Sequence, residues 1–172
     1  MSFRRIVPKP AGFTLVELLI VVIIIAILAA VVVPQFSDTG NQAREAALDA
    51  NLATMRSAIE LYQQQHGAFP GRNASTGGAA NSAQAFTEQM TLFSNAAGLT
   101  SATRDNTNFR FGPYLRRGVP VEQVSQSAAI EIVTAGTLNM TASTTPAAGP
   151  GGWRYDPITG QLIANTVALQ GR

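Results

Sequence analysis

Hydrophobic positions are concentrated in one long run near the N-terminus. The 21 residues from Phe13 to Val33 are all apolar except Thr14 and Glu17. As a helix rising about 1.5 Å per residue, this run spans roughly 30 Å, the thickness of a bilayer's hydrocarbon core. A cleaved secretory signal is the alternative, but its apolar region is usually shorter, about 7–15 residues, and ends at a small-x-small site. We therefore predict a membrane-spanning helix over residues 13–33.

The polar residues at the start of this run set its orientation. Three cations, Arg4, Arg5 and Lys9, precede it, Gly12 stands immediately before it, and Glu17 lies one helical turn inside it. Positive residues beside a membrane segment remain cytoplasmic, so the chain after Val33 should lie outside the inner membrane. Without residues 1–12, nine cations and ten anions remain. That balance gives no support for nucleic-acid binding by bulk charge.

The segment Gly12-Phe13-Thr14-Leu15-Val16-Glu17 resembles the class III signal of type IV pilins and type II secretion pseudopilins. In that family, a membrane peptidase cuts after the glycine and methylates the new N-terminal phenylalanine. The resemblance implies that residues 1–12 are a leader peptide and that Gly12 and Phe13 form the processing site. It also implies prepilin peptidase as a partner. We expect Glu17 to act in assembly, by pairing with the amine that cleavage creates at Phe13.

Helical periodicity resumes over residues 34–66. Pro34 removes one backbone donor, which indicates either the exit from the bilayer or a hinge in the helix. Pilins carry a proline at the equivalent position, so the resemblance favours a local hinge over a full break. An apolar stripe at spacings of 4, 3, 4 and 3 predicts an amphipathic helix, formed by Leu48, Leu52, Met55, Ile59 and Tyr62. The stripe is short for a coiled coil, so we expect a sheet to cover it.

Residues 67–172 are predicted to form a globular head. His66-Gly67 ends the long helix, and a second helix is expected from Ala83 to Ala97, capped by Asn81 and stopped by Gly98. Two hairpins are expected, one over residues 129–141 and one over residues 152–164, giving about four antiparallel strands. The predicted fold class is α+β and pilin-like: a long N-terminal helix, half membrane and half amphipathic, packed against a small antiparallel sheet.

Residues suited to catalysis or metal binding are sparse. The chain has no cysteine and a single histidine, His66, which we interpret as a polar residue at a helix end. No enzyme activity and no cofactor are expected. Major pseudopilins bind calcium through clustered acidic residues, whereas this chain has only Glu122, Glu131 and Asp156 after Asp105. A weak site at Asp156 stays open, but we expect no strong metal site. The pair Arg116-Arg117 fits a solvated turn better than a contact with a neighbour's acidic patch.

The resemblance implies a structural filament subunit, and we favour a pseudopilus of a type II secretion system that supports protein export. The alternative is a type IV pilin for adhesion, motility or DNA uptake, and a membrane-anchored periplasmic binding protein or enzyme is a third option. Expected partners are identical subunits, sibling pseudopilins, an inner-membrane assembly platform and membrane lipid, without nucleic acid. The expected location is the bacterial inner membrane, single-pass, with a cytoplasmic N-terminus and a periplasmic head. After assembly, the chain would lie in a periplasmic or surface filament.

Overall fold

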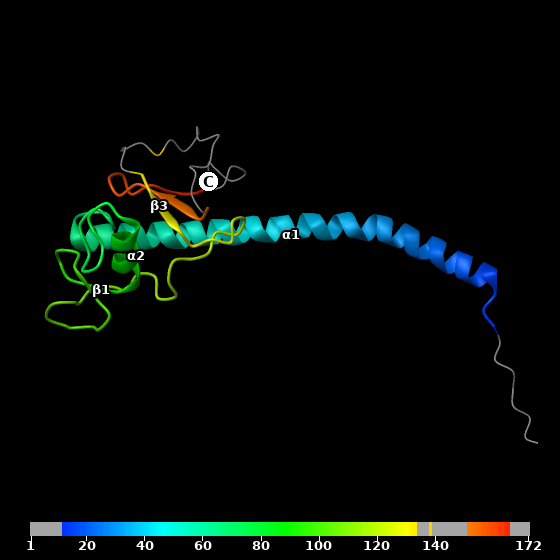
Figure 1. Cartoon of the computed structure of the whole chain (residues 1–172), viewed down its shortest axis with the longest axis horizontal. Helices are drawn as coiled ribbons and strands as arrows, with labels where there is room; N and C mark the ends of the chain where they lie inside the picture. The colour runs from blue at the N-terminus through cyan, green and yellow to red at the C-terminus, as the bar shows by residue number, and fades with distance from the viewer. Residues whose placement is uncertain (1–11, 134–137, 139–150, 166–172) are drawn as a thin grey trace, which may run out of the picture. The chain divides into compact units, whose positions relative to one another are not determined.

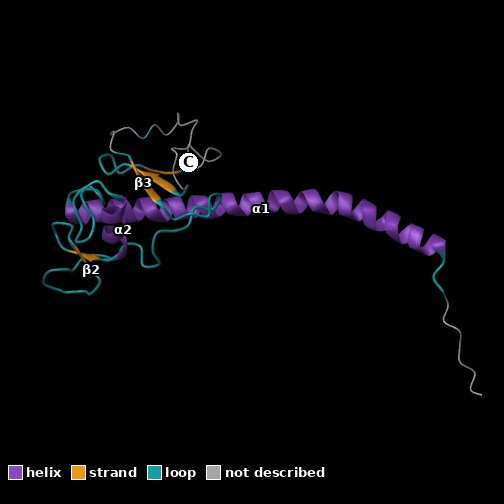
Figure 2. Ribbon diagram, viewed as in Figure 1, coloured by secondary structure: helices purple, strands orange, loops and turns teal. Residues whose placement is uncertain are grey.

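The computed structural model describes residues 12–133, 138 and 151–165, with the backbone alone over 31–39. The chain divides into two compact units, Met1–Gln42 and Ala43–Arg172, which are treated separately below. The longest element, helix α1 (Leu15–His66), contributes residues to both units (Figures 1 and 2).

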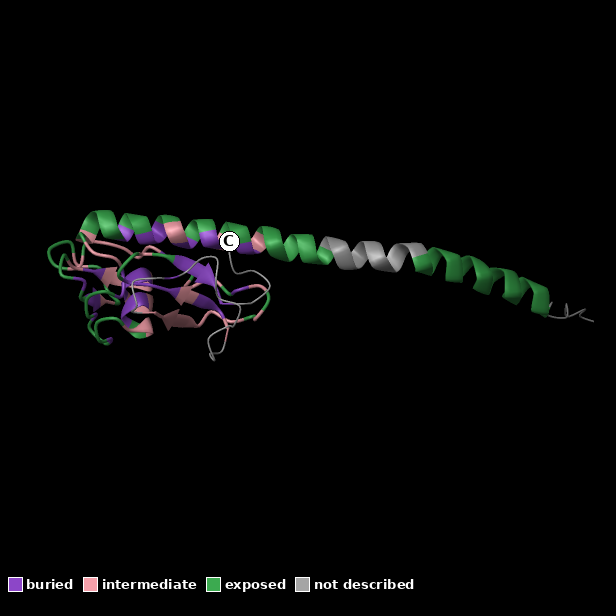
Figure 3. Cartoon of the chain, turned by 90° about the horizontal axis from the view of Figure 1, so that it is seen from above, coloured by how far each residue is buried: buried purple, intermediate pink, exposed green. Residues whose placement is uncertain are grey.

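In the first unit, the part of α1 from Leu18 to Val33 has no polar side chain on any face. Every large hydrophobic residue from Phe13 to Leu28 is 47–81% exposed, and the ribbon of that segment is green for exposed (Figure 3). A helix without a polar face is normally covered by lipid or protein. Within the described residues, no helix meets the combined length and hydropathy expected of a membrane crossing. Pro34 lies inside α1, so the helix is not broken there; the expected hinge remains a prediction.

In the second unit, the predicted stripe of α1 is the centre of the core. Leu48, Leu52, Met55, Ile59 and Tyr62 are each at most 2% exposed. They pack against Phe86 and Met90 and against the sheet residues Trp153, Tyr155 and Leu162. The Trp153 indole donates a hydrogen bond to the Pro120 carbonyl at 2.7 Å. These contacts confirm that a sheet covers the amphipathic half of α1 and that the single tryptophan is a core residue.

The second helix is shorter than predicted. Helix α2 spans Ala83–Thr91, and its cap is Ser82, whose hydroxyl accepts from the Ala85 amide at 3.1 Å. The predicted Asn81 cap was therefore wrong by one residue, and the predicted extension to Ala97 was also wrong. The chain becomes extended at Leu92, and beyond β1 the Asn95 side-chain oxygen accepts from the Ala97 and Leu99 amides and forms a tight turn. That turn joins strands β1 (Phe93–Ser94) and β2 (Thr100–Ser101) in an antiparallel pair.

The main sheet has the order β3-β4-β5, with β3 at Ile130–Ile132, β4 at Trp153–Tyr155 and β5 at Leu162–Ala164. Strands β4 and β5 form the predicted hairpin. Strand β3 pairs with β4 in parallel, which corrects the expectation of a purely antiparallel sheet. The connection over residues 133–152 is long enough for the crossover that parallel pairing needs. The partner strand expected near residues 138–141 lies almost entirely outside the described residues.

The fold class is confirmed. The structure is α+β, with a long N-terminal helix packed against small sheets, in agreement with a pilin-like fold.

Candidate functional site

The start of α1 forms a reciprocal cap between Thr14 and Glu17. The Glu17 carboxylate accepts from the Thr14 amide and the Thr14 hydroxyl, both at 2.9 Å, and the Glu17 amide donates to that hydroxyl at 3.2 Å. This is a capping box, in which a Thr and a Glu three residues later satisfy each other's free amides. Sequence reasoning missed the contribution of Thr14, although its T-x-x-E spacing is visible in the chain.

Gly12 and Phe13 lie just before this cap and are exposed. A Cβ atom added at Gly12 would meet no heavy atom within 4 Å. Among the described residues, no neighbour therefore stands in the way of a side chain at this position. The structure thus brings three predicted site residues, Gly12, Phe13 and Glu17, into one exposed N-terminal segment, and Pro34 lies well along α1 from them.

In the head, His66 lies among aromatic and hydroxyl groups at the end of α1. Its Nε2 atom is 3.1 Å from the Tyr114 hydroxyl and 3.2 Å from the Ser94 hydroxyl, and its ring stacks on Tyr62 at 4.0 Å. Burial lowers the pKa of the imidazole. His66 therefore connects the end of α1 to β1 and to the segment that carries Tyr114.

The acidic residues considered for calcium have local roles. Glu122 is fully buried and accepts from the amides of Val124 and Ser125 at 2.9 and 2.6 Å. Asp156 is also fully buried and accepts from the Ile158 amide at 2.7 Å. Glu131 accepts from the Asn165 side chain at 3.0 Å. In the part of the chain that the structure describes, no three His, Cys, Asp or Glu residues are grouped as a metal site requires.

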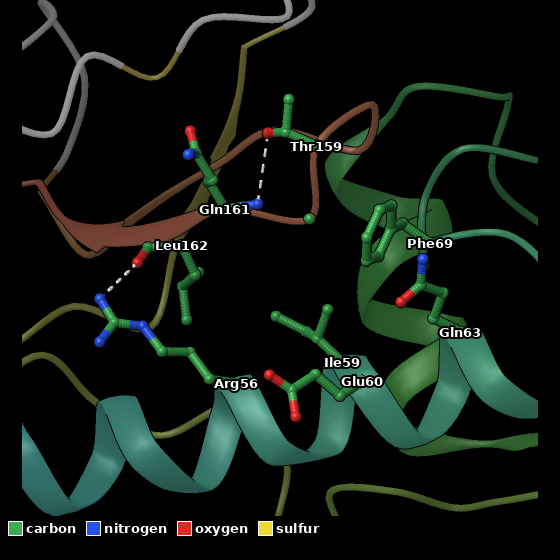
Figure 4. Close-up of a pocket in the computed structure, with 9 residues that line it drawn as sticks. Arg56, Ile59, Glu60, Gln63, Phe69, Thr159, Gln161 and Leu162 are labelled. Carbon is green, nitrogen blue, oxygen red and sulfur yellow. Dashed lines mark hydrogen bonds between the residues drawn. The ribbon is translucent and has the colours of Figure 1, made fainter.

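Several cavities border α1 in the head, and two of them also border other segments. One, of about 290 Å³, lies between α1 and the turn that joins β4 to β5. The Arg56 guanidinium there donates to the Leu162 carbonyl at 3.0 Å, and Glu60 extends from the next turn of the helix (Figure 4). Its lining includes no Ser, Cys or His nucleophile paired with a base. The other, of about 540 Å³, contains Arg116 and Arg117.

Comparison with known proteins finds similarity in this N-terminal part of the chain. Residues 8–33 match the family model described as the prokaryotic N-terminal methylation motif. The major component PilA5 of the type IV narrow pilus of Thermus thermophilus is 42% identical over 62 residues, 36% of this chain and 53% of that protein. A fimbrial protein of Neisseria meningitidis serogroup B is 41% identical over 71 residues, 41% of this chain and 42% of its own.

A protein of a type II secretion system also resembles this chain over a stretch of similar length. The type II secretion system core protein G of Pseudomonas aeruginosa is 37% identical over 62 residues, 36% of this chain and 44% of its own. The chain thus spans about half the length of these relatives, or less. No solved structure gives a significant match.

These matches, together with the α+β head, support a likeness to type IV pilins and type II secretion pseudopilins, and the likeness in sequence covers only the N-terminal part of the chain.

Proposed function

We propose that the chain is a structural subunit of a pilus-like filament and has no catalytic role. The observation that carries this proposal is the N-terminal half of α1, whose large hydrophobic residues are 47–81% exposed and lie within the matched methylation motif. Such a surface has to be covered in the working state of the protein. Membrane lipid covers it before assembly, and the equivalent helices of neighbouring subunits cover it within the filament.

Each segment of the chain has its own role in processing, membrane insertion or filament assembly. Residues 1–12 are a leader that prepilin peptidase removes, and residues 13–33 are the membrane and assembly helix. Residues 34–66 continue that helix into the head, with Pro34 as a local hinge, and residues 67–172 form the head. The chain starts in the inner membrane with its N-terminus cytoplasmic and its head periplasmic. An assembly platform then draws it into a filament with identical and sibling subunits.

Two machines fit this subunit, and we favour a type II secretion pseudopilus. The chain has no cysteine, whereas type IV pilins often close their C-terminal region with a disulfide. The similarity to the secretion core protein G supports the same choice. A type IV pilus is the second candidate, since the Thermus and Neisseria relatives are named as pilus components. A reporter strain lacking either the secretion ATPase or the pilus assembly ATPase would separate the two by which deletion abolishes the filament.

Processing at Gly12 is the direct test. Gly12→Val should leave full-length precursor in the membrane, because a side chain obstructs access to the scissile bond, while a Cβ atom at Gly12 meets none of the described residues within 4 Å. Intact-mass analysis of the wild-type protein should show a chain that begins at Phe13 with one extra methyl group. Gly40→Val is the matched control, because Gly40 also has open space around it and should leave processing unchanged. Assembled filaments that retain the leader would contradict the proposal.

A further inference from the structure

Helix α1 begins directly after the proposed processing site, and Thr14 forms the boundary. The Thr14 carbonyl accepts the first hydrogen bond of the helix, from the Leu18 amide at 3.3 Å. Residues 12–14 are exposed and lie outside the helix. Within the described residues, no group donates a hydrogen bond to the carbonyl of Gly12 or of Phe13. The peptide bond that joins these two residues is therefore free of helical hydrogen bonding.

The Thr14 hydroxyl determines which acceptor the Glu17 amide uses. That amide donates to the hydroxyl at 3.2 Å. If the helix continued toward the N-terminus, the same amide would donate to the Phe13 carbonyl, and the Val16 amide would donate to the Gly12 carbonyl. The hydroxyl therefore competes with extension of the helix across the Gly12–Phe13 bond. This competition is strong beside a membrane, where an amide without an acceptor is costly.

Extension of the helix would hinder hydrolysis of the Gly12–Phe13 bond. Enzymes that cleave an acyl bond stabilise the developing charge on its carbonyl oxygen with positioned hydrogen-bond donors. In an extended helix, the Gly12 carbonyl oxygen would already accept from the Val16 amide, and a turn would have to unwind first. A bond that already lies outside the helix spares the enzyme that reorganisation.

We propose that Thr14 is a positioning residue for processing: its hydroxyl caps α1 and keeps the Gly12–Phe13 bond outside the helix for prepilin peptidase. The matched methylation motif, residues 8–33, includes this boundary. The role is separate from that of the Glu17 carboxylate, because this capping bond uses the Glu17 backbone amide. The inference rests on the proposed function, which requires cleavage after Gly12.

The rate of cleavage in the full-length chain tests this role, measured by pulse labelling. Thr14→Val keeps the branched shape but lacks the hydroxyl, so its precursor should be cut about fivefold more slowly, the shift that loss of a typical N-cap produces. Thr14→Ser keeps the hydroxyl and should be cut at the wild-type rate. Glu17→Leu should also be cut at the wild-type rate, because it keeps the amide that Thr14 caps.

Thr54→Val is the matched control, because it removes a hydroxyl that donates within α1 to the Ala50 carbonyl at 2.8 Å. Its precursor should be cut at the wild-type rate. A wild-type rate in Thr14→Val, or a slow rate in Thr14→Ser, overturns the inference. Equal slowing in Glu17→Leu or in Thr54→Val overturns it as well, because the effect would then not belong to the Thr14 hydroxyl.

NMR of the full-length precursor tests the conformational step. The precursor is purified in detergent micelles from cells that lack the peptidase. The carbon chemical shifts of Gly12 and Phe13 should be non-helical in the wild-type chain and should move toward helical values in Thr14→Val. Slow cleavage with unchanged shifts would mean that the hydroxyl contacts the peptidase directly, and the positioning role would be overturned.

Cleavage of the wild-type precursor separates this inference from the proposed function. If the wild-type chain is cut after Gly12 and Thr14→Val is cut equally fast, only the role of Thr14 fails. If the wild-type precursor is not cut by prepilin peptidase, the proposed function fails and the role of Thr14 fails with it. Because slower cleavage still goes to completion, the filament yield of Thr14 variants at steady state is not the measurement that decides this role.

Discussion

Two roles compete at Glu17, and the structure shows only one of them. Its carboxylate closes the capping box with Thr14, which stabilises the first turn of the helix. A carboxylate at the centre of a membrane helix costs about 2.5–3.5 kcal/mol, and less near an end. The cap offsets part of that cost. After cleavage, the amine of Phe13 would supply a cation within reach, either in the same chain or from an incoming subunit.

Substitutions at the two capping residues separate charge from capping. Glu17→Leu should be processed and inserted normally but should give few filaments. Glu17→Gln keeps hydrogen-bonding capacity without the charge, so it should fail in the same way if ion pairing drives assembly. Thr14→Ala removes the two hydrogen bonds of the Thr14 hydroxyl but leaves the carboxylate, and it should assemble close to wild type. Filament yield is measured by shearing and immunoblotting. Wild-type yield from Glu17→Gln, or failure of Thr14→Ala, would make capping the role of Glu17.

His66 should make the head sensitive to mild acid. Burial lowers its pKa below the ordinary value of 6.5, so the folded head binds the proton less readily than the unfolded chain. The neutral ring therefore contributes stability that is fully present above about pH 6.5 and is lost as pH falls toward the folded-state pKa. His66→Gln should flatten the dependence of the urea midpoint on pH in this window. Because His66 is the only histidine in the chain, an unchanged pH profile would exclude it as the cause.

Among the structural elements, the β4–β5 turn depends on a close approach between Gly160 and Phe69. Gly160 has φ +74°, and an added Cβ would overlap the Phe69 ring. Gly160→Ala should therefore lower the free energy of unfolding by about 2–4 kcal/mol, the sum of backbone strain and overpacking. Gly118→Ala is the matched control, because Gly118 has φ +84° but open space around it, and should show the backbone cost alone. Equal losses in urea titrations would show that the Phe69 contact is unimportant.

The elements that the sequence predicted correctly are those with local signals. The stripe from Leu48 to Tyr62 repeats with the helical period, and the Asp156–Gly160 turn joins strands adjacent in sequence, so both follow from nearby residues. The parallel pairing of β3 with β4 joins segments separated by residues 133–152, and no local pattern encodes that choice. The end of α2 was misplaced for a different reason: Leu92 is extended, and Phe93 and Ser94 pair as a strand with residues 100–101 instead of continuing the helix.

At the scale of the whole molecule, the sequence predicted the part of the candidate site whose residues are contiguous in the chain. The motif from Gly12 to Glu17 is contiguous, so its resemblance to a processing signal could be recognised without a fold. The cavity of about 540 Å³ that contains Arg116 and Arg117 could not be predicted in this way. It forms only when residues 113–121 pack beside Asn51 and Thr54. The sequence favoured a solvated turn for Arg116-Arg117. The structure confirms that both are exposed and adds the cavity around them.

The head should fold without the membrane half of the chain. Residues 43–172 form a compact unit whose core comes from the α1 stripe, Phe86, Trp153 and Leu162. Deleting residues 1–42 should therefore leave a monomer that unfolds cooperatively. Met55→Ala in this fragment should cost about 2–5 kcal/mol, because Met55 is fully buried in that core.

The same fragment also tests for a metal. Glu122 and Asp156 each accept backbone hydrogen bonds within their own turns, and these bonds do not depend on a cation. A chelator should accordingly leave the melting temperature of residues 43–172 unchanged, and added calcium should not raise it. The Met55→Ala fragment, melted in parallel, shows that the assay detects a real loss of stability. If the chelator lowers the melting temperature and calcium restores it, a calcium site exists in the C-terminal loops and the expectation of no strong metal site is wrong.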